Sequence, residues 1–371
     1  LSEAKDITFK PRIYLDNEYI LHAEYREVFK NSNLKTDFSF NRNENKTNLH
    51  LFANYSGELD DNTNYDLKVE NVNNNNYLKI HDIKSYTPFI KNDSVLTSYL
   101  KVEKNIDNNT SLNTTLRLYE DLSKKSSDKY QYIFPDFNFA KNIEVDQSYN
   151  GQFKFNSSGF QKVYDTNIYE TLISNDFNFE SYDFFSSSGL VSDYSILLKN
   201  FNTYSENSSV YENKNDHEIF GTFLLKTELP LKKRQDEGNS FLKPVAQFRF
   251  SPTNGKNIST SGSRLGYSGI FSSNRIGRTD MVEKGESLTL GLEFEKQNLQ
   301  NEKTFGFNVG NIFKLEKNLT LPKKSKLDQT RSDIIGDLFY KLDDNFEVNY
   351  NFSYDRDLDF SNYDALALKI G

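Results

Sequence analysis

A polar segment at residues 267–295 holds the residues whose types and spacing best suit chemistry. It reads YSGIFSSNRIGRTDMVEKGESLTLGLEFE, with Arg275 and Arg278 shortly before Asp280. Guanidinium groups form strong, often bidentate hydrogen bonds with carboxylates. The segment then leads into the alternating apolar residues of 288–294. Two interpretations are open: a structured loop whose ion pairs lie in a wet interior, or an ordinary solvated loop.

The rest of the chain offers little to an enzyme. Its 4 His show neither metal-ligand spacing nor triad spacing with an acidic partner, and it has no Cys for a thiolate site. The acidic run SYDRDLDF lacks the spacing and the glycine of a calcium loop. The glycines of GSRLGYSG precede no helix that could cradle a phosphate. We therefore predict no catalytic residue, no cofactor and no metal site, and we expect His22 to face inward from a strand.

The elements that position these residues are strands. Residues 345–355, NFEVNYNFSYD, place Phe346, Val348, Tyr350, Phe352 and Tyr354 on one face and polar side chains on the other. This period of two is that of a strand with one apolar and one polar face. Similar patterns recur along nearly the whole chain, and the helical period is not sustained anywhere. The sequence therefore predicts an all-β fold.

Composition narrows the kind of β protein. Mean hydropathy is −0.73, yet the chain has 31 Phe and 23 Tyr, too many for a disordered polymer. No run approaches the roughly 18 apolar residues of a membrane-spanning helix. The net charge of −8, with scattered Lys and Arg, argues against a nucleic-acid partner.

The lengths of the predicted strands and links favour a membrane barrel. Many strand patterns run about 10 residues, which matches a tilted membrane strand. Short links such as KNSN and DDNT alternate with longer ones at 71–92, 120–128, 252–286 and 316–329. Outer-membrane barrels sort their turns and loops in this way. We therefore predict a large antiparallel transmembrane β-barrel, of which this chain supplies about 16 to 18 strands.

The polar segment resembles a stretch of the LptD family, the lipopolysaccharide-assembly barrels also called organic solvent tolerance proteins. The matching residues are Phe271, Asn274, Arg275, Gly277, Asp280, Gly285, Leu288, Thr289, Gly291 and Leu292. Where the family usually has an Arg after the Asp, this chain has Met281, and we expect Arg278 to substitute for that Arg. Four further stretches resemble the family in order: DITFKP (6–11), EYR (24–26), FLKPVAQFRFSP (241–252) and SDIIGDLFYKLDDNFEVNYNFSYDRDLD (332–359).

The resemblance implies a domain and a function. Residues 1–371 would belong to an outer-membrane β-barrel domain, with an N-terminal jellyroll and the last strands outside this chain. Such a barrel is not an enzyme. It lies in the outer membrane of a Gram-negative bacterium, surrounded by outer-membrane lipid. It receives lipopolysaccharide from a periplasmic bridge protein through the jellyroll and inserts it into the outer leaflet, while an LptE-like lipoprotein plugs the lumen.

The same resemblance assigns roles to individual residues. Lipopolysaccharide leaves such barrels sideways between the first and last strands, and prolines lie beside that seam. Pro11 is therefore the expected lateral-gate residue. Asn274, Arg275, Gly277, Arg278 and Asp280 are the expected signature of a loop that folds into the lumen.

Two other classes of protein remain open at this stage. A generic outer-membrane porin or receptor would share the barrel pattern but not the ordered motifs. A soluble β-rich surface adhesin or solenoid would share the alternation over shorter strands.

Overall fold

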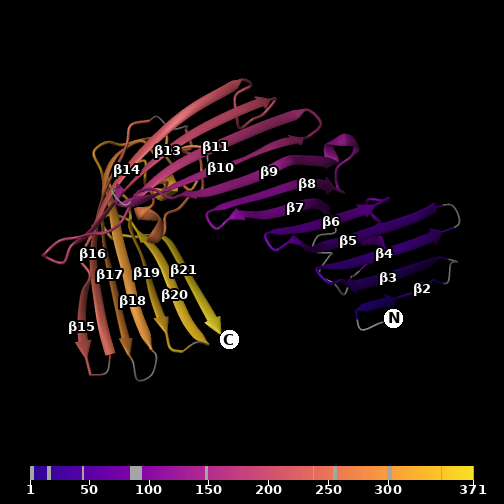
Figure 1. Ribbon diagram of the computed structural model, residues 1–371, viewed down its shortest axis with the longest axis horizontal. Coiled ribbons are helices and arrows are strands. Elements are labelled where there is room, and N and C mark those ends of the chain that lie inside the picture. The colour runs from indigo at the N-terminus through magenta and orange to yellow at the C-terminus, as the bar shows by residue number, and fades with distance from the viewer. Residues whose placement is uncertain are drawn as a thin grey trace. The chain divides into compact units, whose positions relative to one another are not determined.

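The computed structural model describes residues 4–14, 18–43, 46–83, 94–146, 149–236, 238–253, 257–278, 280–298, 303–343 and 345–370. Within these residues, 21 strands belong to one sheet, and the strand pairs are antiparallel (Figure 1). The strands are β1 (Lys5–Phe9), β2 (Arg12–Ile13), β3 (Tyr19–Val28), β4 (Ser32–Asn43), β5 (Lys46–Asp60), β6 (Thr63–Val72), β7 (Val95–Asp107), β8 (Thr110–Asp121), β9 (Tyr130–Ile143), β10 (Gly151–Tyr164), β11 (Ile168–Ser181), β12 (Phe184–Phe185), β13 (Val191–Glu206), β14 (Asn215–Glu228), β15 (Leu231–Gln235), β16 (Gly238–Ser251), β17 (Gly285–Asn298), β18 (Thr304–Lys314), β19 (Ile334–Lys341), β20 (Phe346–Tyr354) and β21 (Ser361–Ile370). The predicted all-β fold is confirmed.

Three of the 21 described strands continue the strand before them. Strands β1 and β2 both pair with β3, β11 and β12 both pair with β13, and β14 and β15 both pair with β16. Pro11 and Pro230 lie at two of these interruptions. The ring of proline fixes φ and bends the backbone locally, so an interruption next to that position is expected. Counting each interrupted strand once leaves 18 runs, which agrees with the predicted 16 to 18.

The chain divides into two compact units. The first comprises Leu1–Asn142, Asn156–Asn175 and Asn202–His217, and the second comprises Ile143–Phe155, Asp176–Phe201 and Glu218–Gly371. Strands β1 to β9 thus lie in the first unit apart from the last residue of β9, strands β15 to β21 lie in the second, and β10, β11, β13 and β14 contribute residues to both.

In the first unit the sheet buries polar side chains and exposes apolar ones. Its buried face carries His22, Asp37, Ser39, Asn41 and His50. The opposite face of the same strands carries Leu21, Phe38, Leu49 and Leu51, each more than 40% exposed. A soluble protein would show the reverse arrangement, because burial of apolar surface drives its folding. We call the two surfaces the inner, polar face and the outer, apolar face.

A short helix packs on this inner face. Helix α1 (Tyr77–Ile80) buries Tyr77 and Leu78 in a small apolar cluster with Phe52 and Leu96. The 3-10 helices η1 (Ser126–Lys129), η3 (Ser268–Phe271) and η4 (Lys323–Ser325) lie in links between strands. No helix among the described residues is long and apolar enough to span a membrane.

The second unit repeats the arrangement of faces. Strands β16 to β21 follow one another in a regular ladder (Figure 1). Their outer face exposes Phe248, Leu288, Leu290 and Leu338, and their inner face buries Gln247, Arg249, Ser287 and Thr289. On β20, Tyr350 pairs with Leu338 on one side and with Leu366 on the other. The apolar side of residues 345–355 thus lies on the outer face, as the alternation predicted.

Candidate functional site

A row of polar side chains crosses three neighbouring strands on the inner face of the second unit. Arg249 of β16 lies opposite Ser287 of β17, and Ser287 lies opposite Lys314 of β18. Residues directly opposite each other on adjacent strands have their side chains on the same face. The register therefore presents two cations and one hydroxyl side by side at one end of the ladder.

The loop between β16 and β17 returns to this wall and packs on it. Side chains around η3 lie over two glycines, Gly291 of β17 and Gly310 of β18, which face each other in the ladder. A Cβ on Gly291 would lie 2.7 Å from the Phe271 ring, and a Cβ on Gly310 would lie 2.4 Å from Ile270 Cδ1. The absence of side chains at the two positions thus allows the loop to approach the strands closely.

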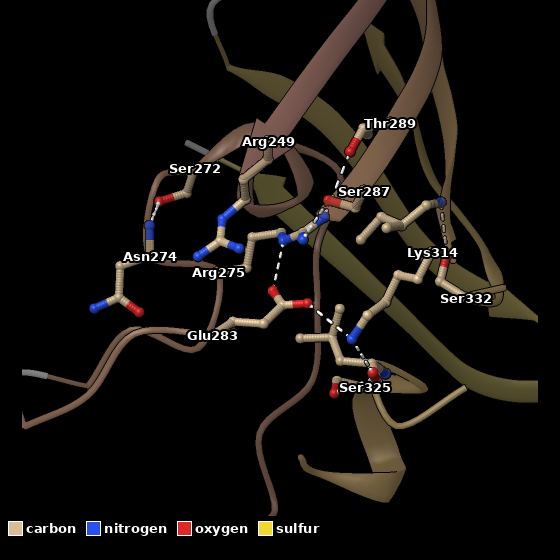
Figure 2. A network of polar contacts seen from close by, with 12 residues as sticks. Arg249, Ser272, Asn274, Arg275, Glu283, Ser287, Thr289, Lys314, Ser325 and Ser332 are labelled. Carbon is tan, nitrogen blue, oxygen red and sulfur yellow. Dashed lines mark hydrogen bonds and ion pairs between the residues drawn. The ribbon is translucent and has the colours of Figure 1, made fainter. Parts of the chain in front are cut away.

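Two cations flank one buried carboxylate of the same loop (Figure 2). Arg275 Nε donates to Glu283 Oε2 at 2.8 Å, and Lys314 Nζ lies 3.1 Å from Glu283 Oε1. Arg275 also donates to Ser287 Oγ at 2.8 Å, which ties the loop to β17. The side chains of Arg275 and Glu283 are 0% and 1% exposed. Charge-assisted hydrogen bonds of this kind are strong because little water competes for them.

Arg249 adds a third cation to this network. Its guanidinium is fully buried, and Nε donates to the carbonyl of Ser273 at 3.2 Å. Its two terminal nitrogens have no hydrogen-bond partner within the described part of the chain. Figure 2 shows Arg249 beside Arg275, above Glu283. Three cations thus gather around one carboxylate, and we call Arg249, Arg275, Glu283 and Lys314 the buried ion network.

The network changes the acidity of its carboxyl group, which lies in the loop between β16 and β17. Burial by itself would raise the pKa of Glu283, because an apolar environment disfavours the charged form. The positive charges of Arg275, Arg249 and Lys314 outweigh burial and hold the pKa of Glu283 below its usual value. Glu283 is therefore ionised at neutral pH.

The other signature residues form a separate turn. Arg278 donates to both oxygens of Asp280, at 2.7 and 2.5 Å, and Asp280 is buried. Asn274 Nδ2 donates to the carbonyl of Arg278 at 2.5 Å. Gly277 has φ +70°, a conformation that glycine adopts without a steric penalty. The structure therefore brings Asn274, Gly277, Arg278 and Asp280 together, while Arg275 turns to Glu283.

Sequence reasoning named Arg275 but missed Arg249, Glu283 and Lys314. A signal existed for Arg249, because it alternates with Phe248 and Phe250 and so had to point inward. No comparable signal marks Glu283, which lies in a loop. The residues that meet depend on strand register, and alternation alone leaves register open.

Pro11 lies between β1 and β2, and its exposed ring sits at a defined place in the ladder. Lys10 N donates to the carbonyl of His22 at 2.8 Å, and Tyr14 N donates to the carbonyl of Glu18 at 2.9 Å. In antiparallel pairs, successive residues direct their N–H groups to opposite edges. The backbone N–H groups of even-numbered residues in this stretch point to β3, so the backbone nitrogen of Pro11 faces the other edge of the strand. Pro11 therefore removes no hydrogen bond to β3.

Comparison with known proteins gives one clear match. The family model described as LptD, LPS transport system D, matches residues 46–368. Pro11 lies outside the matched residues. No curated protein matches the chain.

Solved structures resemble the chain only weakly. The crystal structure of OccK11 (OpdR) from Pseudomonas aeruginosa has a TM-score of 0.35 and 9% identity, and the match covers 99% of this chain and 91% of that one. The unliganded ferric citrate transporter FecA gives 0.30 and 8%, covering 95% and 65%. A loop L8 deletion mutant of OmpT, an outer membrane protein of Vibrio cholerae, gives 0.24 and 6%, covering 84% and 94%.

Proposed function

Because this chain belongs to the LptD family, LPS transport system D, we propose that it carries lipopolysaccharide through its barrel and releases it sideways into the outer leaflet. The family places the chain in the Gram-negative outer membrane as a β-barrel transport protein. Its exposed apolar and buried polar faces suit such a wall, since lipid solvates one side and water or protein the other. We propose that this sideways release passes the first strand.

The edge geometry of Pro11 is the observation that supports this release. A barrel closes when its first strand pairs with its last, and each missing donor weakens that seam. Pro11 leaves pairing with β3 intact and removes a donor from the opposite edge. Within a membrane, few other partners are available for the carbonyl that such a donor would meet. The first strand thus stays attached to β3 while its other edge remains easier to open.

We further propose two protein partners and a role for the buried ion network. An LptE-like lipoprotein would occupy the lumen and contact the inner face, and a periplasmic bridge protein would deliver lipopolysaccharide through a domain outside this chain. The network fastens the loop between β16 and β17 to the inner face through Ser287 and Lys314. A fixed loop offers a plug protein a defined surface. The polar inner face accommodates the sugar and phosphate groups of the lipid.

A single substitution at Pro11 tests sideways release. In the full-length protein, Pro11→Ala restores an N–H on the seam edge, and we expect slower appearance of lipopolysaccharide at the cell surface with normal barrel assembly. Surface labelling measures export, and heat-modifiable migration on gels measures assembly. Pro244→Ala is the matched control, because Pro244 lies in β16, inside the ladder between β17 and the β14–β15 strand. Unchanged export in Pro11→Ala, or an equal defect in both variants, would refute the proposal.

A further inference from the structure

A second polar row crosses β3, β4 and β5 on the inner face of the first unit. His22 lies opposite Ser39, and Ser39 lies opposite His50. Asp37 lies two residues before Ser39 on β4 and therefore on the same face. Two imidazoles and one carboxylate thus converge from three neighbouring strands.

Their ligand atoms already point at one another. His22 Nε2 lies 2.7 Å from Asp37 Oδ1, and His50 Nε2 lies 2.9 Å from the same oxygen. One ligand atom from each residue lies within 4.8 Å of the other two. All three side chains are 0% exposed. Two His and one carboxylate form a donor set typical of divalent transition metals.

The surroundings orient one imidazole for this role. Ser39 Oγ lies 2.6 Å from His50 Nδ1 and 2.7 Å from the hydroxyl of Tyr77. A hydrogen bond to the far nitrogen fixes the ring and directs the near nitrogen toward the site, as second-shell groups do in metal sites. By contrast, His22 Nδ1 is buried and has no hydrogen-bond partner within the described residues.

The charges at this point favour a cation. Glu24 lies directly opposite Asp37 in the β3–β4 register, and both side chains are buried. Like charges that face each other across strands are destabilising. Lys10 lies 2.6 Å from Glu24 and offsets part of this repulsion. A divalent ion would add positive charge where the carboxylates meet.

We propose that His22, Asp37 and His50 bind a divalent transition metal, with Zn²⁺ as the best-suited ion. Zinc bonds to nitrogen and oxygen of about 2.0–2.2 Å place tetrahedral ligands about 3.3–3.6 Å apart. Each imidazole nitrogen would therefore move away from Asp37 Oδ1 by roughly half an ångström or slightly more, while the two nitrogens already lie within 4.8 Å of each other. The ion would join β3, β4 and β5 into a rigid support beside the first strand.

Sequence spacing could not reveal this site. His22 and Asp37 are 15 residues apart, and Asp37 and His50 are 13 apart, with each residue on a different strand. Familiar metal motifs place ligands a few residues apart on one helix or loop. Here the strand register brings the ligands together, so the expectation of no metal rested on a pattern that does not apply to sheets.

Cobalt provides a direct test because tetrahedral Co²⁺ absorbs visible light strongly. The full-length protein, purified in detergent and stripped with a chelator, is titrated with Co²⁺ and then with Zn²⁺. We expect one equivalent of Co²⁺ to give the tetrahedral absorption bands and one equivalent of Zn²⁺ to remove them. Absence of stoichiometric bands from the folded wild type, with no Zn²⁺ retained on metal analysis, would overturn the proposal.

Variants then identify the ligands. We expect His22→Ala, Asp37→Asn and His50→Ala each to weaken Co²⁺ binding at least tenfold. His217→Ala is the matched control, since His217 contacts Asn202 elsewhere and should retain wild-type binding. Heat-modifiable migration checks that each variant folds. Should a variant misfold, the wild type still decides the matter: a Zn²⁺-dependent rise in its unfolding temperature that His217→Ala shares supports the site, and no rise refutes it.

Discussion

Replacing Glu283 with glutamine should destabilise the barrel more than any other change in the buried ion network. Glutamine keeps the size of the side chain and removes its charge. In the wild type, Arg249, Arg275 and Lys314 surround this one carboxylate, and the side chain of Glu283 is 1% exposed. The Glu283→Gln variant would leave three buried positive charges with no carboxylate among them.

The magnitude follows from the burial of the network. Removing one partner of a buried ion pair costs about 3–5 kcal/mol, because the remaining charge is desolvated without compensation. Glu283 contacts two cations directly, so we expect a value toward the upper end of this range. Arg249→Met is the informative comparison, since Arg249 has two buried nitrogens without partners among the described residues. The Arg249→Met variant lowers the excess of positive charge. We expect it to reduce the free energy of unfolding by less than about 1 kcal/mol or to increase it.

Urea unfolding of the full-length protein in lipid vesicles measures both changes, and Glu286→Gln, an exposed position nearby, is the control. The effect should also depend on pH. Folding lowers the pKa of Glu283, so its contribution is fully present above the unfolded-state pKa of about 4.3 and declines as pH falls through the lower folded value. The difference between wild type and Glu283→Gln should therefore shrink only in acid. If Glu283→Gln lost no more free energy of unfolding at neutral pH than Glu286→Gln, the reasoning would be refuted.

Two further predictions concern the faces of the sheet. Leu290→Arg places a cation on the outer face and should lower the free energy of unfolding by about 2–4 kcal/mol if the residue lies near the midplane of the bilayer. Leu290→Ala should lower it much less. Equal losses of unfolding free energy for the two variants in lipid vesicles would argue against lipid on that face. Gly291→Val should push Phe271 and Tyr267 off the wall, at a cost of about 1–3 kcal/mol, and should speed proteolysis of the loop between β16 and β17. Gly221→Ala, where a Cβ meets only ordinary contacts, is its control. Unchanged cleavage in Gly291→Val would show that the loop does not depend on this contact.

Much of the fold could be predicted because alternation depends on local sequence. The alternation of Phe346, Tyr350 and Phe352 with polar residues predicted a strand and its apolar face. The lengths of strands and links indicated a membrane barrel. The pairing of Arg278 with Asp280 was also within reach, since the two residues are close in the chain. The predicted role of Pro11 gained a geometric basis from the structure and stays a prediction.

The remaining features depended on register. Arg249 and Lys314 are far apart in sequence, and they meet only because Ser287 lies between them in the ladder. His22 and His50 meet across Ser39 for the same reason. A period of two tells which face a side chain takes, but it does not tell which neighbour it finds. Neither polar cluster could therefore be predicted from the spacing of its residues along the chain.

The row on β3, β4 and β5 also bears on how the strands find their correct partners during assembly. If β4 slipped by one residue against β3, Asp37 and Ser39 would turn to the lipid and Phe38 would turn to the polar side. Such a slipped hairpin would lose the contact of Asp37 with His22 and would place a carboxylate in hydrocarbon. A slip by two residues would keep the faces but separate His22 from His50. The row thus favours the native register of β3, β4 and β5, because only that register allows all of its polar side chains to form their contacts at once.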